Sequence, residues 1–227
     1  MKIVNIINEV VNNFLIENSI WYHGTPDVRD INNKGSFTPK TDTIDYISDP
    51  KKWQETQNAM QQARNVGNED KYFKLLDVAG SLRDKMTFKK PIFFTDKHNV
   101  ANTYADPHRS FDYQESEPKT IKVNINDNGK TLKIPAYGER FRGISVDSIR
   151  KALNGEGVSN EEIDKYLAMF PNDISDGKMR TDILAVIAQL LGFDIVDVLG
   201  VLDSYHGGTT KSTVRMVFDP QRIQIIN

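Results

Sequence analysis

The densest run of residues able to do chemistry is Asp203-Ser204-Tyr205-His206-Gly207-Gly208. It contains the acid, the hydroxyl and the imidazole of a hydrolytic site. However, neighbouring residues of one segment cannot fold back onto each other as a catalytic triad, and the sequence has no GxSxG nucleophile elbow. The two glycines suit a polar turn with positive φ angles. We therefore expect a loop here, whose Asp203 carboxylate stays a candidate for other chemistry.

Other kinds of site lack their sequence signature. The chain has no GxGxxG, GxxxxGK[ST], HExxH or EF-hand pattern. Its four histidines are too scattered to suggest a metal site by spacing. The absence of cysteine excludes disulfides, thiolate metal sites and cysteine nucleophiles, and it fits a reducing compartment. We therefore expect no metal cofactor.

Three separated segments carry a more specific signal. They are, in chain order, Tyr22-His23-Gly24-Thr25, then Pro91–Asp96 with the following Ala101–Ala105, and finally Ser212–Pro220. In this order they resemble the nicotinamide-binding framework of the ADP-ribosyltransferase superfamily, of the diphtheria-toxin and poly-ADP-ribose-polymerase type. The residues of these three motifs are similar to those of phage and polyvalent-protein members of the superfamily and to those of anti-CRISPR ADP-ribosyltransferases. The matching residues make up under a quarter of the chain.

The resemblance implies a role in NAD+ binding for five of these residues. His23 would hydrogen-bond the adenosine ribose, and Gly24 would bind the carboxamide through its backbone. Thr25 would add a hydroxyl contact in the same turn. Tyr104 would stack on the nicotinamide ring, because an electron-rich aromatic face suits a pyridinium cation. Phe93 would stack at the position where polymerase members carry a tyrosine.

The catalytic acid is the point at which the sequence departs from the family. Most active members carry a glutamate four residues before the aromatic that is Phe218 here, and that position is Val214. Three alternatives stay open: Asp203 supplies the carboxylate, which we favour of the three, or the acceptor supplies its own, or the domain binds without catalysis. That Asp203 is simply a turn residue also stays open. Arg215 has two interpretations, contact with an NAD+ phosphate or pairing with an acid on the strand surface.

NAD+ already has a cationic leaving group, so breaking its glycosidic bond needs no general acid. The site must instead stabilise an oxocarbenium-like ribose. The resemblance therefore implies a mono-ADP-ribosyltransferase with NAD+ as co-substrate and with His23, Tyr104 and Asp203 as catalytic residues. Its target would be a macromolecule, a host protein if the phage resemblance holds. The alternative is a catalytically silent module that binds NAD+ or a partner protein.

Hydrophobic periodicity predicts the elements that must position these residues. Strands are expected at Ile20–His23, Pro91–Phe94, Thr120–Ile125, Thr131–Ile134, Phe193–Leu199 and Thr213–Phe218. The Asn128-Gly129 pair favours a tight turn, so the strands on either side of it are predicted to form a hairpin. Helices are expected from Asp49-Pro50 to Gly67, around Tyr72–Ala79, after a cap at Asp96, at Val146–Leu153 and Glu161–Phe170, and at Asp182–Leu191 after a cap at Thr181.

Two further features bear on the site. The polar stretch from Pro26 to about Ile47 is expected to be a surface loop. Phe93 and Phe94 alternate along one strand, so one of the two must belong to the core.

These patterns predict an α+β fold, which the resemblance refines to ADP-ribosyltransferase-like split, mixed or antiparallel sheets with flanking helices. At 227 residues the chain fits one domain spanning residues 1–227. An amphipathic helix is expected at residues 1–18. A helical insert is expected at residues 38–90. It has two interpretations: a surface for target recognition, or packing around the N-terminal helix, which is the commoner outcome.

Composition narrows the choice of partner and compartment. Acids number 31 and bases 29, so no global field attracts nucleic acid, and a nucleic-acid target would need a local basic patch. Asparagines interrupt the apolar N-terminal stretch, which is therefore neither a signal peptide nor a membrane span. We expect a cytoplasmic protein, in the host cytoplasm if phage-encoded, with no membrane partner.

Overall fold

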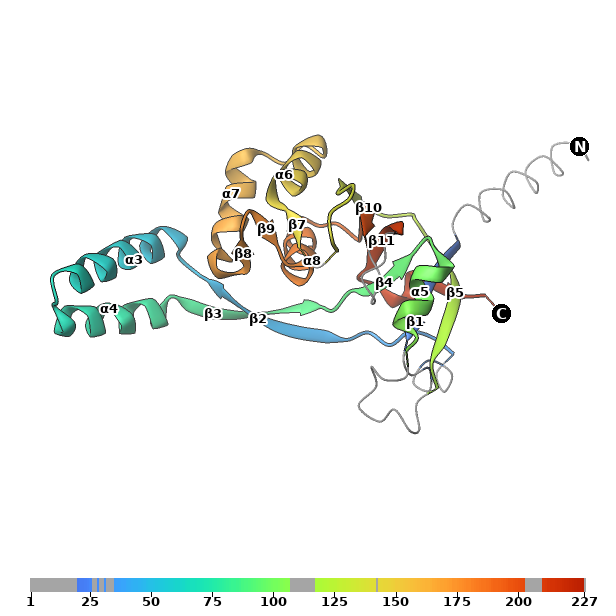
Figure 1. Ribbon diagram of the computed structural model, residues 1–227, viewed down its shortest axis with the longest axis horizontal. Helices are drawn as coiled ribbons and strands as arrows, with labels where there is room; N and C mark the ends of the chain where they lie inside the picture. The colour runs from blue at the N-terminus through green and yellow to red at the C-terminus, as the bar shows by residue number, and fades with distance from the viewer. Residues whose placement is uncertain are drawn as a thin grey trace, which may run out of the picture.

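The computed structural model describes residues 20–25, 28, 31, 35–106, 117–141, 143–202 and 210–226. The helix predicted at residues 1–18 and the loop with Asp203 lie outside this part of the chain. Within it, the protein is mixed α+β, with a seven-stranded mixed sheet, two smaller sheets and helices α3 to α8 (Figure 1). The predicted α+β class is confirmed.

The main sheet has the strand order β12-β5-β1-β4-β11-β10-β6. All neighbours are antiparallel except β10 and β6, which run parallel. The strands are β1 (Ile20–Thr25), β4 (Ile92–Thr95), β5 (Lys119–Ile125), β6 (Thr131–Pro135), β10 (Ile195–Leu202), β11 (Lys211–Val217) and β12 (Ile223–Ile225). Each strand predicted from the sequence is therefore present.

The sheet consists of two halves that meet at β1 and β4. Strand β1 pairs with β5 along its whole length, but with β4 at the single pair Tyr22↔Thr95. Strand β4 in turn pairs with β11 over all four of its residues. The two strands therefore separate beyond Tyr22, where β1 continues through His23 to Thr25.

Each face of the sheet has its own core. Trp21, Phe94 and Val217 are buried on one face, together with Val28 and Phe37 from the segment that follows β1. The other face carries the larger core, in which the apolar helix α8 (Thr181–Leu190) packs against residues of β6, β10 and β11. Phe94 is 2% exposed and Phe93 is 36% exposed, so the prediction that one of the pair is core is confirmed.

Two further helices and a small sheet surround α8, and together with α8 they form a part of the molecule that we call the lobe. They are α6 (Val146–Gly155), α7 (Asn160–Ala168) and the sheet β7-β9-β8, whose strands are Ile144–Ser145, Lys178–Met179 and Ile174–Ser175. Short 3-10 turns lie at Pro171–Asp173 and Pro220–Arg222. The three predicted helices are present, although α8 has its N-cap at Arg180 rather than at Thr181.

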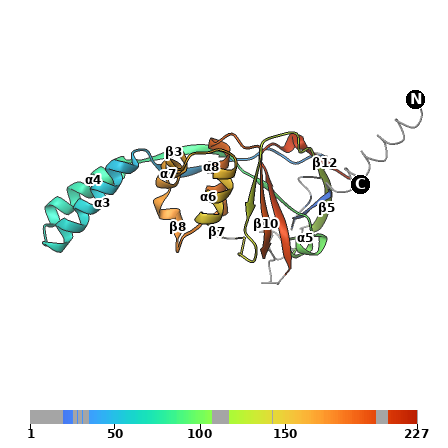
Figure 2. The same ribbon diagram turned by 90° about the horizontal axis from the view of Figure 1, so that it is seen from above.

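The insert is an arm that projects from the rest of the molecule (Figures 1 and 2). Strands β2 (Thr41–Ile47) and β3 (Arg83–Lys89) form a two-stranded ribbon, and helices α3 (Pro50–Asn65) and α4 (Glu69–Ser81) form its tip. Asp49 caps α3 by accepting from the backbone N–H of Lys52, as predicted. The tip has a separate core that includes Trp53, Met60 and Leu82. Among the described residues, no helix has both the length and the apolar character needed to cross a membrane.

The prediction of a surface loop up to Ile47 is wrong for residues 41–47, because they form strand β2. Ile44 and Tyr46 alternate with the exposed Thr43 and Asp45 and pack against the lobe core, beside Met86 and Phe88 of β3. The alternation is present in the sequence, but the partner strand follows about 40 residues later, after two helices. The residues close to either strand in the sequence therefore do not indicate which strand it pairs with.

The predicted hairpin around Asn128-Gly129 is also wrong. Strand β5 pairs with β1 and β12, whereas β6 pairs with β10 near the opposite edge of the sheet. The connecting residues are held by distant partners: Asn126 donates its N–H to the carbonyl of Arg222, and Lys130 donates its N–H to the Asp194 carboxylate. Local bonds at Asn128 and Gly129 remain, but the long-range bonds direct the chain away from β5 instead of back along it.

Asp96 does not cap the helix that follows it. Its carboxylate accepts from the backbone N–H of Thr213 at 2.8 Å, and so ties the end of β4 to the start of β11. Helix α5 (His98–Tyr104) begins after Lys97, which makes no side-chain cap bond. The predicted cap is one residue too early, because Asp96 still belongs to the strand end.

Candidate functional site

A cavity of about 270 Å³ lies where β1 and β4 separate. His23 and Thr25 of β1 and Phe93 of β4 line it, so the structure brings three of the predicted site residues together. The remaining lining residues are apolar or basic apart from Thr38: Ile31, Phe37, Lys40, Lys90, Pro91 and Ile92. The site therefore combines apolar walls with a few polar groups, as ligand-binding cavities do.

The His23 side chain is held in one tautomer. Its Nδ1 lies 2.8 Å from the carbonyl oxygen of Phe93, and because a carbonyl only accepts, Nδ1 carries the proton and donates. The ring packs against Phe37 and Phe94, with centroids 5.1 and 5.5 Å away. This burial lowers the pKa of His23 below its ordinary value of 6.5, against the opposing effect of the Phe93 hydrogen bond. At neutral pH the imidazole is thus uncharged, with Nε2 as an acceptor.

Gly24 and Tyr104 meet on the other side of β1. A Cβ built on Gly24 would lie 1.9 Å from the carbonyl oxygen of Ala101 and 2.9 Å from the Cβ of Tyr104. Helix α5 therefore packs directly against the strand backbone, and only glycine fits there. Tyr104 is half-buried and is not among the residues that line the His23 cavity. The contacts with NAD+ implied for both residues stay predictions.

Arg215 is buried in an ion-pair network rather than exposed on the strand. Its Nε and Nη2 each donate to the Asp197 carboxylate at 2.7 Å, and its Nη1 donates to Asp127. The guanidinium also lies 4.1 Å from the centroid of the Trp21 ring. Burial lowers the pKa of Arg215, but the bonds and charges of Asp197 and Asp127 outweigh it and raise the pKa overall. Pairing with an acid, one of the two interpretations, is present, and a phosphate contact stays a prediction.

No carboxylate in the described part of the chain lines the His23 cavity. Val214, at the position where the resemblance implies a glutamate, is 2% exposed and belongs to the larger core. Asp203 lies outside the described residues. The acid therefore stays unassigned.

Two lysines of this cavity were missed by the sequence analysis. Lys40 precedes β2 and Lys90 follows β3, and the N–H of Lys90 donates to the carbonyl of Lys40 at 2.8 Å. With His23 uncharged, these lysines give the cavity lining a positive charge. No sequence signal could have found them, because it is the pairing of β2 with β3 that brings them together.

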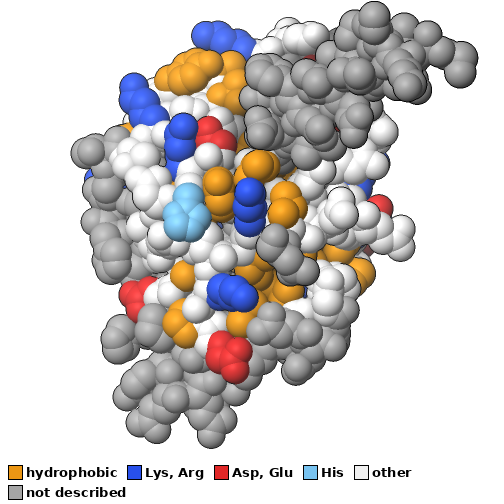
Figure 3. All heavy atoms as spheres, turned by 90° about the vertical axis from the view of Figure 1, so that its right-hand side faces the viewer, with side chains coloured by type: hydrophobic (Ala, Val, Ile, Leu, Met, Phe, Trp, Pro, Cys, Tyr) orange, Lys and Arg blue, Asp and Glu red, His pale blue; other side chains and the backbone are white. Residues whose placement is uncertain are grey.

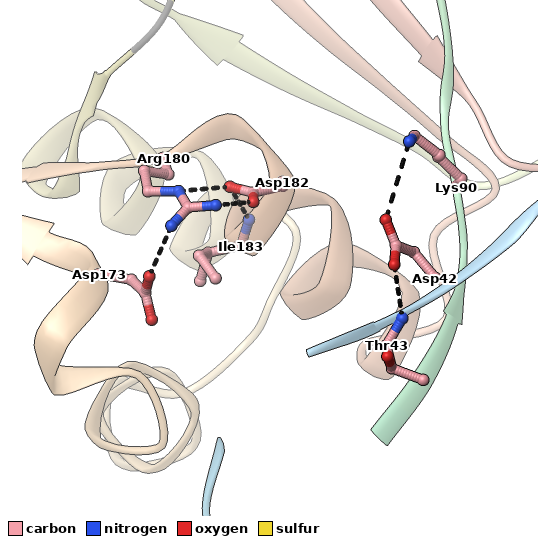
Figure 4. A network of polar contacts seen from close by, with 7 residues as sticks. All are labelled: Asp42, Thr43, Lys90, Asp173, Arg180, Asp182 and Ile183. Carbon is pink, nitrogen blue, oxygen red and sulfur yellow. Dashed lines mark hydrogen bonds and ion pairs between the residues drawn. The ribbon is translucent and has the colours of Figure 1, made fainter. Parts of the chain in front are cut away.

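A second hollow of about 510 Å³ adjoins the first, between the ribbon and the lobe. The two share Lys90, Pro91 and Phe93 in their linings. Arg180 pairs here with Asp173 and Asp182 (Figure 4). Burial raises the pKa of Asp173, and the charge of Arg180 acts against this effect. On the ribbon side, the Nζ of Lys90 lies 3.7 Å from the Oδ2 of Asp42.

The end of the molecule near β1 and β5 is mixed in character. On this face, lysine and arginine side chains stand singly among hydrophobic ones (Figure 3). The described surface there shows no extended basic patch of the kind that grips a nucleic-acid backbone. Within the described residues, no group of three His, Asp or Glu side chains could hold a metal ion.

A comparison with protein-family models, with curated proteins and with solved structures finds no match to this chain. Its function must therefore be argued from the site itself.

Proposed function

We propose that this protein is an NAD+-dependent mono-ADP-ribosyltransferase that modifies a macromolecule, a host protein, and releases nicotinamide. The observation that supports it is the convergence of His23, Thr25 and Phe93 on one cavity. These residues come from segments about 70 positions apart, and the resemblance assigned all three to the same ligand. The separation of β1 from β4 is what opens the cavity between them.

The residues present suit part of an NAD+ molecule. Neutral His23 has an acceptor at Nε2, which matches a ribose hydroxyl, and Phe93 offers an aromatic edge or face. At about 270 Å³ the cavity is slightly smaller than the roughly 300–1,000 Å³ of a drug-sized ligand site. It therefore accommodates one half of a dinucleotide, and the other half must lie outside it.

The proposed reaction breaks the bond between C1′ of the ribose and the nicotinamide nitrogen. Nicotinamide leaves as a neutral molecule with the bonding electron pair, so no proton has to be delivered to it. The acceptor atom of the target bonds to C1′ and loses its own proton. Asp203 or a carboxylate of the target would stabilise the cationic ribose and take that proton.

The arm is the part of this chain best placed to recognise a target. Its helical tip carries exposed apolar side chains, among them Val66, Phe73 and Leu76. Exposed apolar side chains on a projecting element favour contact with another protein over contact with nucleic acid. The near balance of 31 acids and 29 bases favours the same choice.

One observation favours a catalytically silent module instead. No described acid lines the cavity, and the glutamate position is filled by the buried Val214. Such a module would bind NAD+ or a partner protein through the same surface without releasing nicotinamide.

The two functions separate in one experiment. The protein is incubated with labelled NAD+ and a bacterial lysate, beside His23→Ala and Asp203→Ala. A transferase releases nicotinamide and labels a macromolecule, and His23→Ala reduces both by roughly tenfold, the loss of one hydrogen bond. The Asp203→Ala result then identifies or excludes the acid. Absence of release and of label with a folded protein would favour the silent module.

A further inference from the structure

Lys90 occupies the junction between the two hollows. It lines both the cavity at His23 and the second hollow, which is the larger of the two and is called the cleft below. Its ammonium pairs with Asp42 at 3.7 Å, with side chains that are 56% and 52% exposed. An ion pair this exposed contributes little, so a ligand can displace Asp42 at small cost.

Of the positively charged side chains in the cleft lining, Lys90 is the one that can exchange its partner for a ligand. Across the cleft, Arg180 is committed to Asp173 and Asp182, as Figure 4 shows. Arg83, also in the cleft lining, lies over the ring of Trp53 at 5.5 Å. On the cavity side, Lys40 has no ion pair among the described residues, and no described acid balances it within the lining.

Two adjoining hollows that share a lysine suit the two halves and the central charge of a dinucleotide, with the carboxylates Asp42, Asp45, Asp173 and Asp182 also in the lining of the larger hollow. NAD+ has two bulky nucleoside halves joined by a pyrophosphate with two negative charges. We propose that Lys90, assisted by Lys40, binds this pyrophosphate, so that one half lies in the His23 cavity and the other in the cleft. The inference rests on the proposed function, since it concerns how the same site holds NAD+. A lysine ammonium is a suitable partner because it acts as a compact point charge toward phosphate.

Binding of NAD+ and of ADP-ribose to the full chain, measured by calorimetry, tests the assignment. Lys90→Gln is expected to raise both dissociation constants about tenfold, the loss of one charge-assisted hydrogen bond. Lys90→Arg is expected to bind within about threefold of the original protein, because it keeps the charge. The matched control is Lys89→Gln, which removes the same charge one residue earlier, from a residue that lines neither hollow.

Asp42→Asn supplies a test in the opposite direction. Removing the carboxylate frees Lys90, so NAD+ is expected to bind about two- to threefold more tightly. A purely structural role for the pair would make Lys90→Gln and Asp42→Asn act alike. Raised salt is expected to weaken binding to the original protein more than binding to Lys90→Gln.

The outcomes distinguish this inference from the function on which it rests. Equal affinities of Lys90→Gln and Lys89→Gln for NAD+, beside clear binding by the original protein, would overturn the pyrophosphate assignment alone. A folded original protein that binds neither NAD+ nor ADP-ribose would overturn both.

Discussion

His23 donates its Nδ1–H to the carbonyl oxygen of Phe93 at 2.8 Å, across the gap where β1 and β4 stop pairing. The side chain thus replaces a ladder bond that the backbone does not make. This bond fixes the imidazole at the cavity and, with burial, decides its charge. The consequences of the relationship can be measured.

Stability should fall on acidification because of His23. Burial lowers the pKa of His23 in the folded state below 6.5, so between 6.5 and the folded value the unfolded chain binds more protons. The contribution is fully present above pH 6.5 and is lost as the pH falls toward the folded pKa. Urea unfolding at about pH 7.5 and 5.5 should therefore show a smaller pH difference for His23→Gln than for the original protein. His98→Gln, which changes an exposed histidine, is the control, and equal differences in all three proteins would contradict the prediction.

Gly24→Ala should destabilise the fold. The new Cβ would lie 1.9 Å from the Ala101 carbonyl oxygen, so α5 must shift away from β1, at a cost of about 2 kcal/mol. Gly80→Ala is the matched control, because Gly80 is in helix α4 with no atom within 4 Å of its added Cβ. That change should increase the free energy of unfolding by about 0.8 kcal/mol. Chemical denaturation measures both, and equal effects would argue against close packing of α5.

The two acids that bind Arg215 should differ in their contribution to stability. Asp197 is buried, so Asp197→Ala leaves the buried Arg215 with only its bond to the exposed Asp127 and should cost about 3–5 kcal/mol. The Asp127 side chain is 55% exposed, and Asp127→Ala should cost less than about 1 kcal/mol. Thermal or urea unfolding of the two variants gives the comparison. Similar losses from both would show that Asp127 shares the buried charge more than its exposure indicates.

The proposed transferase function predicts that removing the tip of the arm separates target recognition from nicotinamide release. Ile47 and Arg83 are directly paired, so an Asn-Gly turn can replace residues 48–82 and close the ribbon as a hairpin. The shortened protein should keep its sheet and release nicotinamide from NAD+, but transfer less label to the target.

A milder variant of the same test keeps the arm in place. Phe73→Ser with Leu76→Ser removes exposed apolar side chains from α4 without touching the tip core. Undiminished transfer by both variants would locate target recognition elsewhere on the protein. Unfolding of the shortened chain alone would show that the ribbon depends on its tip.

Local chemistry explains which predictions succeeded. The cap at Asp49 with Pro50 at the helix start, and the apolar runs of β4, β10 and β11, depend only on residues that are adjacent in the sequence. The pairing of strands depends on residues that are far apart in the sequence. The partners of β2 and of β6 lie about 40 and 60 residues away, so neither the ribbon nor the parallel pair could be predicted. The convergence of His23 and Phe93 was expected only through the resemblance, and Lys90 was not expected at all.

The order of strands in the sheet also sets an order of events during folding. Strand β11 lies inside the sheet, between β4 and β10, and β12 lies at one edge, although both come from residues 211–225. While the ribosome is still making this last stretch, β4 and β10 each lack the neighbour that β11 will supply. The helical tip of the arm, whose contacts are local, can form earlier. Assembly of the sheet must then wait until synthesis has passed residue 217, and until that moment the half-made edges need protection from aggregation.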